Sequence, residues 1–211
     1  MLKVGLTGGI ASGKSVVGEM LVAMGAHLIR ADEISHQLMR PGCVVYDKVV
    51  AQFGREILNS DGTVNRARLA EAAFGTAVGG ASRVKELNEI VHPEVVRRQD
   101  EWMEEVGRAD PWAVAIVEAA LILEAGAGEH FDRLIVVTCN EEQRAVRFAA
   151  RHKIALEAAR KEVARRMAAQ LPEEEKVKVA DFVIDNSGSI EHTIAQVREM
   201  WRRLSADAGK P

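Results

Sequence analysis

Short apolar runs recur along the chain, and each has a length typical of a buried strand. They occupy residues 2–7, 26–31, 113–117, 134–138 and 182–185. Helical patterns separate these runs, beginning with a helix predicted over residues 14–24. The last pattern, over residues 189–204, has an apolar face formed by Ile190, Ile194, Val197 and Trp201. The alternation predicts an α/β fold with a five-stranded parallel sheet flanked by helices.

Two stretches interrupt this alternation. Residues 32–110 show helical patterns without a clear core strand, and they predict an inserted helical subdomain. Residues 143–179 contain ten arginines and lysines against five glutamates, although the formal net charge of the whole chain is −3. The remaining segments are predicted to form one core domain from residues 1–31, 111–142 and 180–211.

Polar residues stand at the ends of the predicted strands. Thr7 ends the first run, and the second, third and last runs lead to Asp32, Glu118 and Asn186. In open parallel sheets, ligands bind beyond the carboxyl ends of the strands. These residues are therefore candidates for ligand binding.

The segment directly after the first run reads Gly8-Gly9-Ile10-Ala11-Ser12-Gly13-Lys14-Ser15. It matches the phosphate-binding loop Gly-x-x-x-x-Gly-Lys-Ser, in which backbone N–H groups and a helix start surround phosphate oxygens. Lys14 is expected to reach the β- and γ-phosphates of ATP, and the Ser15 hydroxyl to bind Mg²⁺. The predicted ATP-binding residues here are Gly9, Ile10, Ala11, Ser12, Gly13, Lys14, Ser15 and Val16. A glycine-rich turn without a ligand is the alternative. With this loop, the fold is expected to be of the P-loop type, with residues 1–31, 111–142 and 180–211 as its nucleotide-binding core.

The composition and charge of the chain limit which kinds of partner it is expected to bind. Hydrophobic residues make up 47% of the 211 residues, and the pI is about 6.1. Because there is no overall basic field, neither nucleic acid nor an anionic membrane is expected as a partner, and no obligate protein partner is evident. The chain has no apolar run of membrane-spanning length and no signal-peptide pattern, so a cytoplasmic location is expected. Cys43 and Cys139 lack metal-ligand spacing and are expected to be reduced thiols.

Arginines in residues 143–179 recur at helical spacing. Arg144, Arg147 and Arg151 share one predicted helix face, and Arg166 lies on a later helix. Next to a triphosphate loop, this pattern favours a closing lid, in which Arg147 and Arg166 stabilise the charge of the transferred phosphate. Solvated surface arginines are the alternative reading for each position.

Taken together, the motifs resemble the dephospho-CoA kinase family, over nearly the whole chain. Besides the loop, the resemblance rests on Arg30-Ala31-Asp32-Glu33-Ile34-Ser35-His36, on Ile90-Val91-His92-Pro93-Glu94-Val95, and on residues 118–126, 139–143, 166–170 and 180–186. It implies a kinase that uses ATP with Mg²⁺ to phosphorylate the ribose 3′-hydroxyl of dephospho-CoA, which completes coenzyme A synthesis. Residues 32–110 would then be the acceptor subdomain and residues 143–179 the lid.

Several residues have an expected role in such a kinase. Asp32 is expected to accept the proton of the attacking hydroxyl, unless it only caps the next helix. The resemblance implies that His92 contacts the acceptor and that Asn186 contacts adenine. Thr7 is a candidate for acceptor binding, and Glu118, after the third strand, is expected to bind the metal through water or to face the acceptor. A structural histidine and a plain turn are the alternatives for His92 and Asn186. Pro93 is expected to open a new helix, with His92 near its start.

Three departures from the family pattern change the expectations. Glu118-Ala119-Ala120 stands where many members have Asp-Ile-Pro, which leaves the role of Glu118 open. Ala11 replaces a glycine, which is tolerable if its φ is negative. Lys153 and Ala155 replace a glycine and a helix-starting serine or threonine, which predicts more continuous lid helices.

Other functions share parts of these signals. Another small-molecule or nucleoside monophosphate kinase would have the same loop, sheet and lid, and differ in the inserted subdomain. A GTP-dependent switch is disfavoured because no Asn-Lys-x-Asp element follows a late strand. A non-catalytic ATP-binding protein would keep the loop without needing Asp32 as a proton acceptor.

Overall fold

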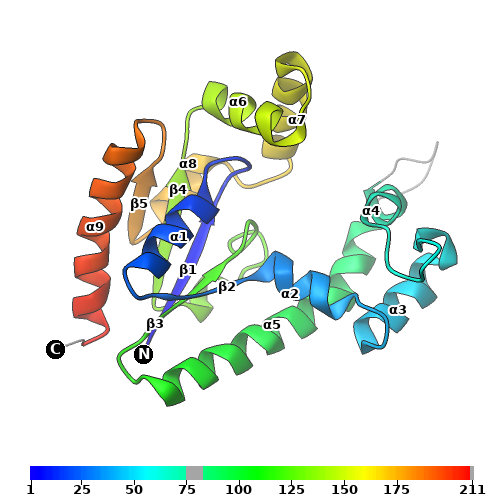
Figure 1. Cartoon of the computed structure of the whole chain (residues 1–211), viewed down its shortest axis with the longest axis horizontal. Coiled ribbons are helices and arrows are strands. Elements are labelled where there is room, and N and C mark those ends of the chain that lie inside the picture. Colours follow the sequence, from blue (N-terminus) through cyan, green and yellow to red (C-terminus); the bar gives the residue numbers. More distant parts are fainter. Residues whose placement is uncertain (75–82, 210–211) are drawn as a thin grey trace. The chain divides into compact units, whose positions relative to one another are not determined.

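The computed structural model describes residues 1–74 and 83–209. The chain divides into two compact units, one formed by Met1–Arg30 with Met103–Pro211 and the other by Ala31–Trp102. The first unit carries the sheet, and the second is built mainly from helices (Figure 1).

The first unit contains a parallel sheet with the strand order β2-β3-β1-β4-β5. Its strands are β1 (Leu2–Gly8), β2 (His27–Arg30), β3 (Val114–Glu118), β4 (Arg133–Thr138) and β5 (Phe182–Asp185). β1 is central, and its Leu6 pairs with Glu118 of β3 and Ile135 of β4. The predicted five-stranded parallel sheet is confirmed, and its short apolar runs are strands because both faces of the sheet are covered.

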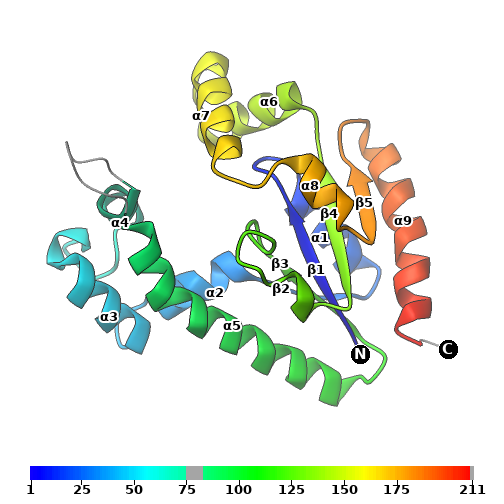
Figure 2. The ribbon, with the colours of Figure 1, turned by 180° about the vertical axis from the view of Figure 1, so that it is seen from behind.

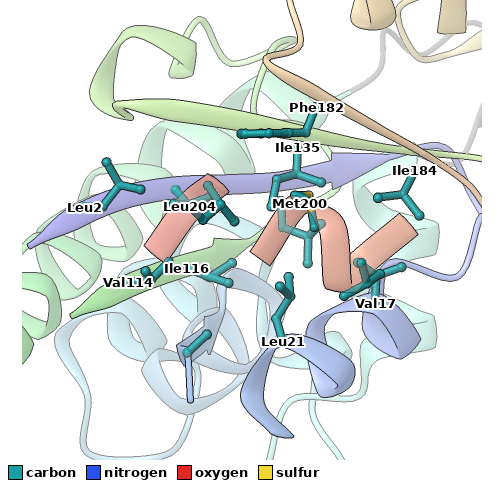
Figure 3. Close-up of a cluster of buried hydrophobic side chains, with 14 of the residues drawn as sticks. Leu2, Val17, Leu21, Val114, Ile116, Ile135, Phe182, Ile184, Met200 and Leu204 are labelled. Carbon is teal, nitrogen blue, oxygen red and sulfur yellow. The ribbon is translucent and has the colours of Figure 1, made fainter. Parts of the chain in front are cut away.

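The main core lies between the sheet and two helices, α1 (Lys14–Ala23) and α9 (Ile190–Asp207). Ser189 begins α9 by accepting a hydrogen bond from the His192 N–H. Figure 3 shows side chains from these helices packed with strand residues, including Val17, Leu21, Ile116, Ile135, Met200 and Leu204. Both helices thereby bury their apolar faces against the sheet.

A smaller cluster forms where alternate β4 side chains point away from the main core. It contains Ile122, Leu134 and Val136, with Phe131 packed against them. The short 3₁₀ helix η2 (Gly128–His130) and α8 (Glu173–Lys178) belong to the same unit (Figure 2). Lys176 of α8 is buried and pairs with Glu124 at 2.7 Å.

Two helices of the lid segment, residues 143–179, follow β4 in the chain. They are α6 (Glu141–His152), which Asn140 caps by accepting from the Gln143 N–H, and α7 (Leu156–Ala168). The expectation of more continuous lid helices is wrong. Lys153 adopts a left-handed conformation with φ +54° and ends α6, and Ala155 then begins α7. Phe148, Ala159 and Val163 pack the two helices together, which offsets the missing glycine and serine.

The second unit begins with α2 (Ala31–Leu38) and continues through α3 (Val44–Phe53), η1 (Arg55–Ile57), α4 (Arg66–Phe74) and the first part of α5 (Val84–Ala109). It has an apolar core of its own, formed by Val45, Val49, Phe53, Ile57, Leu69 and Ala73. Leu58 and Val64 form an isolated antiparallel bridge, which closes the loop before α4.

Pro93 does not open a helix, contrary to expectation. It lies inside the 26-residue helix α5, and His92 is therefore in the interior of that helix. Apolar side chains on both sides of Pro93 are buried or packed against a core, among them Ile90, Val91 and Val95. This packing outweighs the roughly 3 kcal/mol that an interior proline costs a helix.

Two adjacent valines of α1 provide a test of the main core. Val17 is fully buried, whereas Val16 is 44% exposed. Val17→Ala should lower the free energy of unfolding by about 2 kcal/mol, because it removes buried methyl groups and leaves a cavity. Val16→Ala should change it by less than about 0.5 kcal/mol. Urea denaturation of both variants measures the difference, and equal effects would contradict the described packing of α1.

Candidate active site

The loop between β1 and α1 has glycine where a side chain would collide with its surroundings. Gly13 has φ +94°, and a Cβ there would lie 2.0 Å from Asn186 Nδ2. A Cβ at Gly9 would lie 2.3 Å from Arg144 Nη1. These glycines therefore allow two side chains from distant parts of the sequence to reach the loop backbone.

Ala11 has a left-handed conformation with φ +53°, so the negative φ that would make this replacement of glycine tolerable is not present. Such a conformation costs an L-residue about 1–2 kcal/mol. Ile10 and Ala11 pack against the cluster of Phe148, Ala159 and Val163 on α6 and α7. This apolar contact offsets the cost, and it holds the tip of the loop against the lid helices.

Side-chain donors occupy the carbonyl oxygens of the loop. Lys14 Nζ donates to Gly8 O at 3.0 Å and lies 3.4 Å from Gly9 O. Its ammonium group therefore lies at the loop backbone, next to the first two glycines of the motif. The Ser12 hydroxyl is buried without a hydrogen-bond partner in the described parts of the chain.

Ser15 and Glu118 meet at the carboxyl ends of β1 and β3. The Ser15 hydroxyl donates to Glu118 Oε1 at 2.7 Å, and Arg30 Nε donates to Glu118 Oε2 at 3.1 Å. Arg30 also forms an ion pair with Glu19. Thr7 Oγ1, which is buried beside them on β1, donates to Ala120 O at 3.3 Å. The sheet register, which pairs Leu6 with Glu118, brings these oxygen atoms together.

Arg144 of α6 is fully buried and uses its whole guanidinium group. It donates to Cys139 O at 2.7 Å and to Ile10 O at 3.1 Å, and it pairs with Glu173 of α8. The predicted row included Arg144, but it was not among the residues selected to bind phosphate. Its bonds tie the loop to both ends of the lid segment, so it acts as a structural connection.

Arg147, one turn later, lies against the same loop. Its Nη2 donates to Asn186 O at 2.9 Å, and its Nη1 lies 3.4 Å from Ser12 O and 3.1 Å from Cys139 Sγ. Burial raises the pKa of the Cys139 thiol, although the charges of Arg147 and Arg144 act in the opposite direction. The thiol is therefore uncharged at neutral pH, and the positive charge of Arg147 is not neutralised there.

Arg166 has different partners. It donates to Glu162 at 2.6 Å within α7, and its guanidinium lies 5.5 Å from the centre of the Phe148 ring. Hydrogen bonds from Arg165 and Arg166 lower the pKa of Glu162 to about 2, so this carboxylate is charged at neutral pH. In this conformation Arg166 is held on the lid and is not brought to the loop.

Asn186 follows β5 and is buried under the loop. Its Nδ2 donates to Ser12 O at 2.8 Å, and its Oδ1 accepts from the Thr193 hydroxyl at 2.9 Å. Thr193 is also buried, on α9. Sequence reasoning selected Asn186 but missed Thr193, since a single threonine on an amphipathic helix has no distinguishing pattern. The side chain of Asn186 supports the loop from below.

Two further candidates belong to the second unit. Asp32 is exposed in the first turn of α2, where the helix dipole favours a carboxylate. The helix begins at Ala31, so Asp32 is inside it and is not its N-cap. His92 is exposed on α5.

Two features are absent from the residues that the structure describes. Within residues 1–74 and 83–209, no group of three or more His, Cys, Asp or Glu side chains is placed to hold a metal ion. In the same residues, no helix has both the length and the apolar character needed to cross a membrane.

Solved structures share this fold. TT1252 from Thermus thermophilus superposes with a TM-score of 0.78 at 29% identity, covering 96% of each chain. A dephospho-CoA kinase from Campylobacter jejuni has a TM-score of 0.68 at 26% identity and covers 97% of this chain and 98% of its own. A shikimate kinase from Bacteroides thetaiotaomicron has a TM-score of 0.53 at 10% identity, a likeness of fold alone.

Sequence relatives cover the chain almost completely. A dephospho-CoA kinase of Carboxydothermus hydrogenoformans is 40% identical over 195 residues, which are 92% of this chain and 90% of the relative. One of Aquifex aeolicus is 36% identical over 210 residues, 98% of this chain and all of the relative. The family model for dephospho-CoA kinase matches residues 2–192. The chain therefore belongs to the dephospho-CoA kinase family.

Proposed function

We propose that this protein transfers the γ-phosphate of ATP to the ribose 3′-hydroxyl of dephospho-CoA, the final step of coenzyme A synthesis. The observation that carries the proposal is the loop at residues 8–15, with Ser15 bonded to Glu118, in a chain that matches the family over nearly its whole length. Another small-molecule kinase, the alternative from the sequence, is not favoured by this match. A cytoplasmic location is part of the proposal.

The loop binds the triphosphate through its backbone. The first N–H groups of α1 have no partner inside the helix, and the positive end of its dipole points toward the loop. Lys14 leaves the carbonyls of Gly8 and Gly9 and binds the β- and γ-phosphates. The Asn186 side chain is bonded to Ser12 O and Thr193, and its backbone N–H and carbonyl are bonded to Thr138 and Arg147. Any adenine contact at this turn therefore falls to the residues that follow, Ser187 and the exposed Gly188.

The donors near the loop fit Mg²⁺. Ser15 supplies a hydroxyl and Glu118 a carboxylate, which are the hard oxygen donors that this ion prefers. Ser15 would bind the ion directly, and Glu118 would accept from one of its water ligands. The bound ion neutralises phosphate charge and orients the phosphate chain. The hydrogen bond from Arg30 would keep the Glu118 carboxylate oriented.

Asp32 accepts the proton of the attacking hydroxyl and orients it toward the γ-phosphorus. His92 contributes to acceptor binding. Thr7 of β1 and Glu118 of β3, next to the phosphate-binding loop, contribute to it as well. Among the residues that the structure describes, the exposed Asp32 side chain has no hydrogen bond or ion pair, which suits a group that exchanges a proton with substrate. In transfer reactions of this class, such alignment and electrostatic stabilisation account for most of the catalysis.

Arg147 and Arg166 stabilise the charge that develops on the transferred group. Arg147 is already beside Ser12 O, whereas Arg166 would exchange Glu162 for a phosphate when the lid segment closes. Closure also excludes water, which limits wasteful hydrolysis of ATP.

An acceptor panel tests the proposed activity. Purified protein with Mg-ATP is assayed with dephospho-CoA, adenosine, AMP, shikimate and gluconate, and ADP formation is measured. Dephospho-CoA should give the highest kcat/KM. A higher value for shikimate, gluconate or AMP would overturn the assignment.

Lys14→Ala should abolish turnover and weaken ATP binding, because the loop loses its mobile positive charge. Lys48→Ala is the control, since Lys48 is an exposed lysine of α3. Calorimetric Kd values for ATP and the rate of ADP formation are compared for both variants. Retained turnover in Lys14→Ala would remove this residue from the mechanism.

Asp32→Asn should lower kcat about 100-fold or more, while the Kd for ATP changes less than about twofold. The substitution keeps the size of the side chain but removes its ability to accept a proton. Glu33→Gln, in the same helical turn, is the matched control and should stay within about threefold of the parent kcat. Equal kcat values for Asp32→Asn and the parent protein would show that Asp32 is not the proton acceptor.

A further inference from the structure

The second unit contains a cavity of about 260 Å³ that none of the roles above uses. We call it the α2 cavity. It is lined by His36 at the end of α2, by Met39, Arg40 and Pro41 in the turn that follows, and by residues at the start of α4, including Arg66. All of these residues belong to the same compact unit, so the cavity is complete within it.

Two arginines of the α2 cavity have no counter-ion. Within residues 1–74 and 83–209, neither Arg40 nor Arg66 forms a side-chain hydrogen bond or an ion pair. Two other arginines of this unit do have partners: Arg68 donates to Leu58 O at 2.8 Å, and Arg83 pairs with Glu86 at 2.8 Å. Two unneutralised guanidinium groups at one cavity form a site for an anion with two negative charges.

His36 adds a polar group to this site. Partial burial lowers its pKa, and the neighbouring charge of Arg66 lowers it further, whereas Asp32 and Glu33 act in the opposite direction. The imidazole is therefore mainly neutral at pH 7 and is available as a hydrogen-bond donor. Its interaction with Arg66 also places the guanidinium charge on the His36 side of the cavity.

Apart from Thr63, whose hydroxyl is hydrogen-bonded to Asp61, the remaining wall of the cavity is apolar. Met39, Pro41 and Val64 line it, and Met39 and Val64 are half-buried. A free inorganic anion would leave this surface without a partner. The combination favours an anion that is attached to an uncharged chain.

Helix α2 relates the cavity to the proposed proton acceptor. Asp32 and His36 are four residues apart, on the same face of the helix and separated by about 6 Å of rise. In dephospho-CoA, the reacting 3′-hydroxyl and the 5′-diphosphate are attached to the same ribose ring. One face of α2 can therefore reach both groups.

We propose that the α2 cavity binds the 5′-diphosphate of dephospho-CoA and the first part of its pantetheine arm, through Arg40, Arg66 and His36. This assignment rests on the proposed function. Arg40, Arg66 and His36 would then favour an acceptor that carries a diphosphate, such as dephospho-CoA, over adenosine, which has none. Asp32 performs the proton transfer.

Binding measurements on the full chain test this assignment. Arg66→Ala and Arg40→Ala are compared with Arg55→Ala, a control that removes an exposed, unpaired arginine of the same unit outside the cavity. With a non-hydrolysable ATP analogue bound, calorimetry should give a Kd for dephospho-CoA about tenfold higher in each cavity variant. The Arg55→Ala value should stay within about twofold of the parent protein.

Kinetics separate this binding role from a general structural defect. Saturating dephospho-CoA should restore kcat in Arg66→Ala to within about threefold of the parent value, and Arg66→Lys should recover part of the affinity. For adenosine, which lacks the diphosphate, binding and turnover should be the same in the parent and in Arg66→Ala. Thermal unfolding of every variant verifies that it is folded.

The assignment is overturned if the folded cavity variants bind dephospho-CoA as tightly as Arg55→Ala does, or if adenosine loses as much affinity as dephospho-CoA. Failure of the proposed function gives a different result. In that case the parent protein itself does not phosphorylate dephospho-CoA.

Discussion

The site depends on how the carbonyl oxygens of one loop are held. Lys14, Arg144, Arg147 and Asn186 all direct donors at the backbone of residues 8–12, and they come from α1, α6 and the turn after β5. A loop that presents N–H groups to phosphate must have its carbonyls directed elsewhere, and each carbonyl needs a donor. These donors are mostly cationic, so the bonds that shape the loop also make its surroundings positive.

The roles of the arginines in the lid segment follow from how deeply each is buried. Arg144 is fully buried and is bonded to the loop, to Cys139 O and to Glu173, so removing it would leave several buried groups unpaired. Arg147 is partly exposed and touches the loop, and it has no acidic partner within residues 1–74 and 83–209, which leaves its charge available to a nucleotide. Arg166 is nearly half exposed and paired on its own helix, and such surface pairs are weak enough to exchange. One sequence pattern thus contains a structural arginine and two candidates for binding.

Local sequence signals were reliable where local physics decides the conformation. The five strands follow from apolar runs, and α1 follows from the loop motif, because each of these patterns is contained in a short stretch of the chain. The expectations failed where tertiary packing overrides a local preference. Pro93 lies inside α5, near Ile90 and Val91, which pack against the core of the second unit. Lys153 ends α6 without a glycine, and α6 and α7 are packed together by Phe148, Ala159 and Val163. Ala11 has a positive φ and packs against that same cluster. The apolar contacts outweigh the local backbone cost at these positions.

The sequence by itself determined the kind of fold, the phosphate-binding loop and the family, because these depend on residues that are close together in the chain. Only the tertiary structure decided that Ser15 meets Glu118, that Asn186 and Thr193 support the loop, and that Arg40 and Arg66 share a cavity. The members of each of these sets are contributed by different elements. Strand order, sheet register and helix packing bring these residues together. Their spacing along the chain does not predict the distances between their side chains.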